Sequence, residues 1–298
     1  MSLSSVPLKG LAFIHRNDTR FAVGDFYPVL SVFSYQELGA TTSPFLLLDH
    51  LGPAQLEPKT KKRGVNEHPH RGFETVTLMF AGELEHIDSS GGGGVIAAGD
   101  VQWMTAASGV LHREQFSPAF RERGGAFEMI QLWVNLPAKD KLTTPRYQSL
   151  RSADIPVMDL PHQAGRVRII AGDFENRIGP AQTFSRLNVL DIEISAGQEV
   201  VLPAAYGDTT LIYLRAGQIQ FANEDEILAQ QGLAVMKTLG ENVQLTALQD
   251  AKLLLLTGQP LHEPINGHGP FVMNSYAEIL QAYDDIKNGK FTQPILGQ

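Results

Sequence analysis

Apolar and polar residues alternate over short stretches along most of this chain, and turn-forming residues separate the stretches. Residues 73–88, FETVTLMFAGELEHID, and residues 95–106, VIAAGDVQWMTA, are two examples. Alternation with a period of two, bounded by Gly, Asp, Asn and Pro, is typical of antiparallel strands in a sandwich or barrel. We expect the tetraglycine Gly91–Gly94 between them to form a mobile hairpin loop. A phosphate-binding loop is less favoured, because neither a helix pattern nor a lysine follows it.

The strand pattern occurs twice. Residues 75–86, TVTLMFAGELEH, resemble residues 210–221, TLIYLRAGQIQF, at an offset of 135, and residues 99–105 resemble residues 232–238 at an offset of 133. Any two strands bounded by glycine look alike, so either match alone would carry little weight. Their common order and nearly constant offset predict two copies of one β fold.

The predicted fold class is therefore all-β, with two tandem barrels or sandwiches. Residues 137–165 are rich in Pro and polar residues and lack periodicity, which is typical of a linker. We expect an N-terminal domain over 1–140, a linker over 141–165, a C-terminal domain over 166–260 and a tail over 261–298. In this tail, apolar residues at helical spacing and the capping-box pair Ser275 and Glu278 predict one amphipathic helix near 275–287.

Composition restricts the chemistry that the chain can perform. Its 298 residues include 28 Gly, 17 Pro and no Cys, which excludes disulfides, thiolate zinc sites, iron–sulfur clusters and a cysteine nucleophile. Any metal must therefore be bound through nitrogen and oxygen. The formal net charge of −8 argues against direct nucleic-acid binding, and only Lys59, Lys61, Lys62 and Arg63 form a basic run.

The sequence carries no signal for export or for a membrane. It does not begin with the charged and then apolar segments of a secretory leader, and no apolar run approaches the roughly 20 residues that span a bilayer. We expect a cytoplasmic protein that has no membrane association.

Four residues form a candidate metal site. His68 and His70 flank Pro69, and side chains at i and i+2 of a strand point to the same face. Because Pro69 cannot donate a ladder hydrogen bond, the pair should lie at a strand end or edge. His112 and Glu114 repeat the spacing. Three imidazoles and one carboxylate suit a divalent transition metal and leave coordination positions open. Surface histidines beside a solvated glutamate remain the alternative.

The repeat provides an internal control for this site. At the two offsets, the positions of His68 and His70 correspond to Pro203 and Ala205, and those of His112 and Glu114 correspond to Leu245 and Ala247. None of these residues is a metal ligand. If the fold is duplicated, only the N-terminal copy can bind the metal through this set.

Other candidates carry less weight. We expect His50 to cap a turn rather than to line the site, and Trp103 and Trp133 to be core aromatics rather than substrate platforms. Phe73 is expected to shape the pocket wall. Ser108 lies near His112, but no Gly-x-Ser-x-Gly elbow accompanies it, so a hydrolase is not indicated.

Four segments together resemble the pirin family of the cupin superfamily, and the resemblance covers nearly the whole chain. They are HPHRGFETVTLMFAGELEH from residue 68, GDVQWMTAASGVLHRE from 99, QLWVNLP from 131 and HEPINGHGPFVMN from 262. The resemblance implies a bicupin with a metal only in its N-terminal cupin. It implies His68, His70, His112 and Glu114 as ligands, with iron as the usual metal and Ni, Mn, Co, Cu or Zn as alternatives. Glu74, a ligand position in many other cupins, is expected to lie just behind these ligands.

The resemblance implies two classes of function. One is quercetin 2,3-dioxygenase activity on a flavonol-like aromatic substrate and O2, in which we expect Glu114 to act as the base that accepts the proton of the flavonol 3-hydroxyl. The other is metal-dependent binding of a protein partner, either a transcription regulator or a metabolic enzyme. A cupin sugar isomerase is less favoured, because no cluster of basic phosphate-binding residues lies near the motifs.

Overall fold

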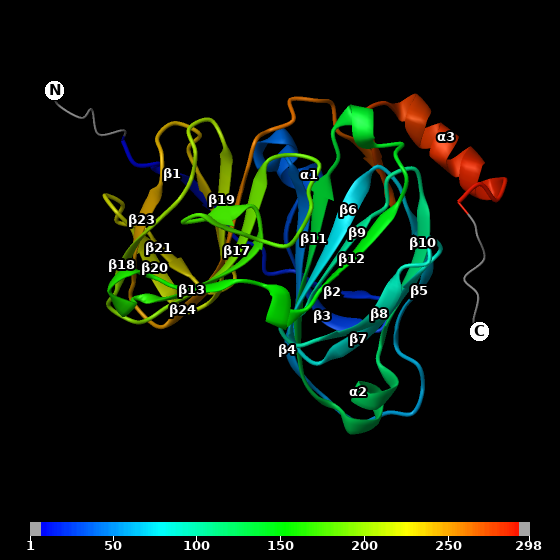
Figure 1. The fold of residues 1–298 in the computed structure, drawn as a ribbon, viewed down its shortest axis with the longest axis horizontal. Helices are drawn as coiled ribbons and strands as arrows, with labels where there is room; N and C mark the ends of the chain where they lie inside the picture. Colours follow the sequence, from blue (N-terminus) through cyan, green and yellow to red (C-terminus); the bar gives the residue numbers. More distant parts are fainter. Residues whose placement is uncertain (1–6, 292–298) are drawn as a thin grey trace. The chain divides into compact units, whose positions relative to one another are not determined.

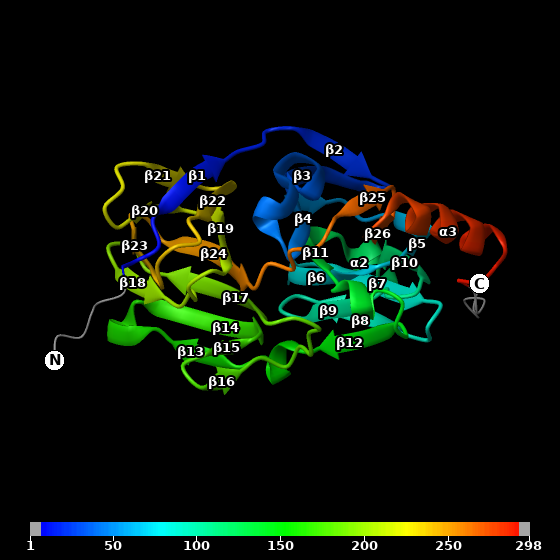
Figure 2. The same cartoon turned by 90° about the horizontal axis from the view of Figure 1, so that it is seen from above.

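The computed structural model describes residues 7–291, which form two compact units (Figures 1 and 2). The N-terminal sandwich comprises residues 18–40, 45–152 and 261–291. The C-terminal sandwich comprises residues 7–17, 41–44 and 153–260. Neither unit is one uninterrupted stretch of the chain, because the first strand pairs with a sheet formed by the second half.

The N-terminal sandwich contains a seven-stranded and a four-stranded antiparallel sheet. In spatial order, the larger sheet contains β12 (Arg146–Leu150), β9 (Val101–Thr105), β6 (Phe73–Ala81), β11 (Gly125–Asn135), β4 (Phe45–Leu56), β3 (Phe26–Ser34) and β2 (Arg20–Val23). The smaller sheet contains β5 (Gly64–His70), β10 (Val110–Phe116), β7 (Glu83–Asp88) and β8 (Gly93–Ala97).

The C-terminal sandwich has the same composition of sheets. Its larger sheet contains β1 (Leu11–His15), β22 (Gly232–Met236), β19 (Thr209–Ala216), β24 (Ala251–Gly258), β17 (Leu187–Ile194), β14 (Gly165–Ala171) and β13 (Val157–Asp159). Its smaller sheet contains β18 (Glu199–Leu202), β23 (Val243–Ala247), β20 (Gln218–Phe221) and β21 (Ile227–Ala229).

The two sandwiches repeat one topology. The order β9-β6-β11-β4 in the first corresponds to β22-β19-β24-β17 in the second, and β5-β10-β7-β8 corresponds to β18-β23-β20-β21. The two segments that match at an offset of 135 span β6 and β7 in the first sandwich and β19 and β20 in the second. The predicted all-β fold with a duplicated architecture is therefore confirmed.

The remaining elements are short. They are the helices α1 (Tyr35–Leu38), α2 (Pro118–Arg123) and α3 (Tyr276–Lys287), the 3-10 turns η1 (Gly39–Thr42), η2 (Ala138–Asp140), η3 (Ser152–Asp154) and η4 (Pro161–Gln163), and the two-stranded pairs β15 (Asp173–Phe174) with β16 (Arg177–Ile178) and β25 (Asn266–His268) with β26 (Phe271–Met273). Among residues 7–291, no helix has the length and apolar character that a membrane span requires.

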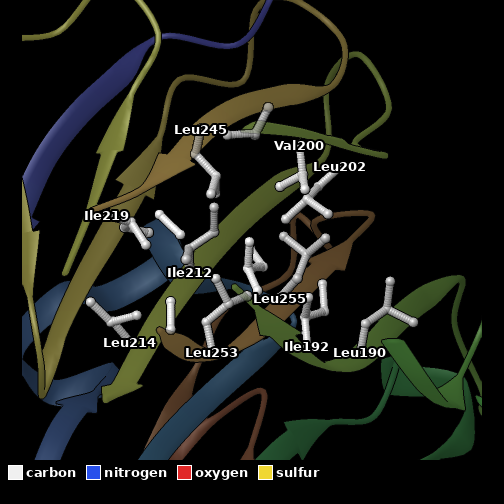
Figure 3. Close-up of a cluster of buried hydrophobic side chains, with 14 of the residues drawn as sticks. Leu190, Ile192, Val200, Leu202, Ile212, Leu214, Ile219, Leu245, Leu253 and Leu255 are labelled. Carbon is white, nitrogen blue, oxygen red and sulfur yellow. The ribbon is translucent and has the colours of Figure 1, made fainter. Parts of the chain in front are cut away.

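Each sandwich is stabilised by side chains packed between its two sheets. In the C-terminal sandwich this core is aliphatic, and Figure 3 shows Ile212, Leu245 and Leu255 among the side chains that meet there. In the N-terminal sandwich, Phe26, Phe116 and Phe127 pack with ring centroids 4.9 to 5.9 Å apart. This aromatic cluster fills only part of the space between the sheets, since a cavity lies beside it.

The predicted C-terminal helix is present as α3, which begins after Ser275. The Ser275 hydroxyl accepts from the Glu278 backbone N–H, and Glu278 accepts from the Asn274 backbone N–H. The helix packs on the N-terminal sandwich beside β5 and β10 (Figures 1 and 2), and Arg71 donates to Asp285 across 2.9 Å. Helix α3, which is far from β5 in the sequence, is therefore held next to the strand that carries His68 and His70.

The tetraglycine segment forms part of a hairpin, as predicted, but only its first two residues lie in the loop. Gly93 and Gly94 belong to β8 and pair with Ile87 and His86. A Cβ on Gly93 would lie 2.7 Å from the His86 carbonyl oxygen, so glycine permits this close pairing. The loop residues Ser90 and Gly92 donate their backbone N–H groups to Asp88, which fixes that carboxylate.

Because Leu255 is fully buried in the aliphatic core, we expect Leu255→Ala to lower the free energy of unfolding by roughly 2 to 5 kcal/mol. Urea denaturation followed by far-ultraviolet circular dichroism measures the change. Leu239→Ala is the control, because Leu239 is 63% exposed. Equal losses in the two variants would contradict the assignment of the core.

Candidate metal centre

The four predicted ligands lie on two paired strands. β5 carries His68 and His70 and is the edge strand of the smaller sheet, as expected from Pro69. β10 carries His112 and Glu114, and His112 is directly opposite His68 in the antiparallel register. A register shift follows His112, so Glu114 pairs with Val65. The i and i+2 spacing on each strand directs all four side chains into the sandwich.

The structure brings three of these residues into one compact set. The candidate ligand atoms of His68, His70 and His112 lie within 4.8 Å of one another. Glu114 belongs to a second set of that size, with His86 and His112, so the two sets share His112. Glu114 is buried, and its Oε1 atom lies 3.2 Å from the Thr77 hydroxyl, which holds it in place.

The imidazoles of His70 and His112 are neutral because they are buried. Burial, reinforced by the neighbouring His68, lowers the pKa of His70 to about 3. Burial also lowers the pKa of His112 well below its ordinary value, and the adjacent His70 and His68 act in the same direction. A neutral imidazole retains one nitrogen lone pair, which is the form that binds a metal.

Hydrogen bonds determine which nitrogen carries that lone pair. The Nδ1 atom of His68 lies 2.8 Å from the Asn66 carbonyl oxygen, and the Nδ1 atom of His70 lies 3.3 Å from the Pro270 carbonyl oxygen. Carbonyl oxygens only accept hydrogen bonds, so both Nδ1 atoms carry the proton. The Nε2 atoms are then left with lone pairs, the arrangement usual for metal-binding histidines.

The Nε2 atom of His112 also keeps its lone pair, but the partner of its Nδ1 atom is of a different kind. Its Nδ1 atom lies 3.4 Å from His86 Nδ1, and its buried Nε2 atom has no hydrogen-bond partner within the described part of the chain. An orphaned, solvent-shielded acceptor nitrogen is costly unless something else binds it. Together with the Nε2 atoms of His68 and His70, it makes a donor set that fits a divalent transition metal.

His86 is better suited to orient His112 than to bind a metal. Its Nε2 atom lies 3.1 Å from Asp88 Oδ2, and its Nδ1 atom lies 3.0 Å from Gln102 Nε2. With Nε2–H donating to the carboxylate, Nδ1 is an acceptor for both Gln102 and His112. Burial alone would raise the pKa of Asp88, but hydrogen bonds from His86, Ser90 and Gly92 lower it overall, so Asp88 remains an anion.

A cavity of about 360 Å³ opens beside the histidines within the N-terminal sandwich. The four candidate ligands form part of its wall, and the other lining residues are mostly apolar: Val23, Phe26, Asp49, Leu51, Val65, Met129, Gln131 and Trp133. A concave, mainly apolar space with a few polar groups is the usual form of a small-molecule site.

Three expectations about neighbouring residues were wrong. Glu74 lies on β6 with Thr77, but three positions apart on a strand means opposite faces, and Glu74 accepts from Thr105 on the far face. His50 lies within β4, where its ring contacts Glu128, and not at a turn. Trp133 lines the cavity, whereas Trp103 is fully buried as expected.

Phe73 is not among the residues that line the cavity. Its ring packs 4.3 Å from Trp133 and 5.1 Å from the ring of His70, measured between centroids. It therefore supports the wall from behind.

Several site residues were missed in the sequence. Asp49, His86, Asp88 and Pro270 lie outside the two ligand motifs, and Pro270 is 200 residues from its partner His70. The available signal was the His86 to Asp88 spacing, since residues at i and i+2 of a strand share a face, and here Leu84 lies on the same buried face. Nothing in the sequence pattern indicated Asp49 or Pro270, because their proximity to the site is a long-range contact.

Two sandwiches of identical strand order in one chain, with a histidine-lined pocket in the first, define a bicupin. The chain belongs to the pirin family. The family's Pirin domain matches residues 28–134, and the Pirin C-terminal cupin domain matches residues 189–292.

The chain is 50% identical over 95% of its length to a Pseudomonas aeruginosa protein named "Putative quercetin 2,3-dioxygenase", of which 99% is covered. The crystal structure of quercetin 2,3-dioxygenase from Acinetobacter baumannii is 48% identical and superposes with a TM-score of 0.92, covering 95% of this chain and 98% of that one. The Escherichia coli pirin YhhW in complex with nickel(II) shares the fold at 20% identity, with a TM-score of 0.62 over 83% of this chain and 99% of that one.

We expect Asp88→Asn to weaken metal binding by about 10- to 100-fold. An amide can donate to His86 Nε2, which moves the His86 proton to Nδ1. His112 Nδ1 must then accept, and its Nε2 becomes protonated and loses the lone pair. Competition of Ni(II) or Co(II) against a chromophoric chelator measures the affinity.

The matched control is Asp18→Asn, because Asp18 is exposed. Its affinity should equal that of the wild type, and thermal melting should show that both variants fold. An unchanged affinity in Asp88→Asn would refute the orienting role of His86 and Asp88.

Proposed function

We propose that this protein is a metal-dependent dioxygenase that cleaves a flavonol such as quercetin with O2, releasing carbon monoxide and a depside. The observation that supports it best is the set of three imidazoles whose Nε2 atoms are free to bind a metal beside a mainly apolar cavity of about 360 Å³. The dioxygenase names of the relatives agree with it. The proposed ligands are His68, His70, His112 and Glu114.

Fe(II), the proposed metal, would supply Lewis acidity and the redox capacity that reaction with O2 requires. Imidazole and carboxylate ligands also accept Ni, Mn, Co, Cu and Zn, so the donor set alone does not select iron. A cytoplasmic location, where iron is kept reduced, belongs to the same proposal.

The residues of the chain perform the other tasks. Glu114 accepts the proton of the flavonol 3-hydroxyl, and Thr77 holds its carboxylate at 3.2 Å. Phe26, Met129 and Trp133 provide an apolar surface for the aromatic rings and exclude water. The fixed Nδ1 partners of the histidines keep their Nε2 atoms oriented without reorganisation during the reaction.

A metal-dependent binding role towards a protein partner is the second candidate. The observation that favours it is the basic run from Lys59 to Arg63, whose three lysines are exposed between β4 and β5. A solvated loop also explains this run. A stoichiometric partner that copurifies with the wild type and is lost from His68→Ala would support the binding role over catalysis.

Metal-loaded wild-type protein should consume quercetin in air, measured as loss of flavonol absorbance, and chelation should abolish the reaction. We expect Glu114→Gln to lower kcat by about 100- to 10,000-fold, because the amide cannot accept the proton. Metal content is measured in parallel, since Glu114 is also a proposed ligand.

Glu122→Gln is the control, because Glu122 is exposed on α2. It should retain wild-type activity. Absence of quercetin loss with Fe, Ni, Mn, Co and Cu in turn would overturn the proposed function.

A further inference from the structure

One row of polar side chains crosses the interior face of the larger sheet of the N-terminal sandwich. Cross-strand pairing aligns Gln102 with Thr77, Thr77 with Gln131, Gln131 with Asp49, and Asp49 with Ser31. Residues paired in this way across neighbouring strands lie on one face of a sheet. Five adjacent strands thus contribute five polar residues to a surface that normally carries apolar ones.

The duplicated fold shows what the same row contains without a pocket. The corresponding row of the C-terminal sandwich is Ala234, Ile212, Leu255, Leu190 and Ile169, aligned by the same pairings. All five belong to the aliphatic core, and Figure 3 shows Ile212, Leu255 and Leu190 within it. The topology therefore does not require polar residues here, and their presence in the N-terminal sandwich needs a functional reason.

At the end of the row nearest the candidate ligands, the polar residues already have a functional reason. Gln102 contacts His86, which orients His112, and Thr77 contacts Glu114. Gln131 lies 3.1 Å from the Thr77 hydroxyl and extends the row into the cavity. These three residues support the candidate ligands.

The carboxyl group of Asp49, further along the row, does not have all of its hydrogen-bonding capacity used by the protein. It lines the cavity, its carboxyl group interacts with Ser31, and no described residue provides a hydrogen-bond partner for its shielded Oδ1 atom. Burial raises the pKa of Asp49 to about 7, and the hydrogen bond from Ser31 offsets only part of this effect. Rotation about χ2 is soft for aspartate, so either oxygen can face the cavity.

We propose that Asp49 recognises the substrate by accepting a hydrogen bond from a phenolic hydroxyl remote from the metal-binding end, which makes it a specificity-determining residue. This inference rests on the proposed function and identifies the substrate class as polyhydroxylated rather than plain aromatic. A ligand hydroxyl supplies the partner that the carboxyl lacks, while Leu51, Met129 and Trp133 contact the rings.

The spacing of the row agrees with a ligand of several rings. Thr77, which contacts Glu114, lies on β6, and Asp49 lies two strands away on β4. Two strand spacings correspond to about 10 Å. That length suits a three-ring flavonol better than a small acid bound only at the metal.

The test compares quercetin with 3-hydroxyflavone, which shares the 3-hydroxyl and 4-carbonyl groups but lacks the other four hydroxyls. Both are titrated anaerobically into metal-loaded, full-length protein, so that binding is measured without turnover. We expect the wild type to prefer quercetin and Asp49→Leu to weaken quercetin binding by about 10- to 100-fold, with 3-hydroxyflavone bound as before.

Asp49→Asn preserves the shape of the side chain and one acceptor, so it should lose part of the preference for quercetin over 3-hydroxyflavone. It replaces Asp49→Leu in the test if that variant does not fold. Asp18→Leu is the exposed control, and metal content should be equal in all variants. An unchanged preference, or equal weakening of both flavonols, would overturn the role of Asp49 and leave the proposed function intact. If metal-loaded wild type bound neither flavonol, the proposed function and this role of Asp49 would both be overturned.

Discussion

The orientation of three imidazole rings is the constraint on which the rest of the site depends. Each ring has its Nδ1 atom held by a hydrogen-bond partner: the Asn66 carbonyl on the same strand, the Pro270 carbonyl 200 residues away, and His86 on the neighbouring strand β7. These partners leave the three Nε2 lone pairs together at the wall of the cavity. Burial keeps the rings of His70 and His112 neutral, and a neutral ring can act as a ligand. The position of the C-terminal segment and the shape of the β7–β8 loop both serve this arrangement.

Duplication of the fold shows how the same architecture gives either a core or a site. In the C-terminal sandwich, Leu245 and Ala247 occupy the strand positions that correspond to His112 and Glu114, and both belong to the aliphatic core. Polar residues in that space would be buried without partners and would destabilise it. In the N-terminal sandwich, Gln102 contacts His86 and Thr77 contacts Glu114, and the interior retains a cavity instead of closing.

Much of the fold could be read from local pattern. Alternating residues, the repeat near an offset of 135 and the Ser275 cap predicted the strands, the duplication and α3, because strand and helix periods are local properties. The same period predicted that His68 and His70 share a face. It was insufficient for Trp133, since a period shows which residues share a face but not which face meets the cavity.

The sequence by itself determined the fold class, the second copy's lack of these ligand types and the pairing of ligands along each strand. Only the tertiary structure decided that Pro270 reaches His70, that Asp88 orients His112 through His86, and that Asp49 faces the cavity. The physical reason is the range of the interactions. Alternation is set by neighbouring residues, whereas ring orientation and pocket polarity are set by strand pairing and sheet packing, which bring together residues far apart in the chain.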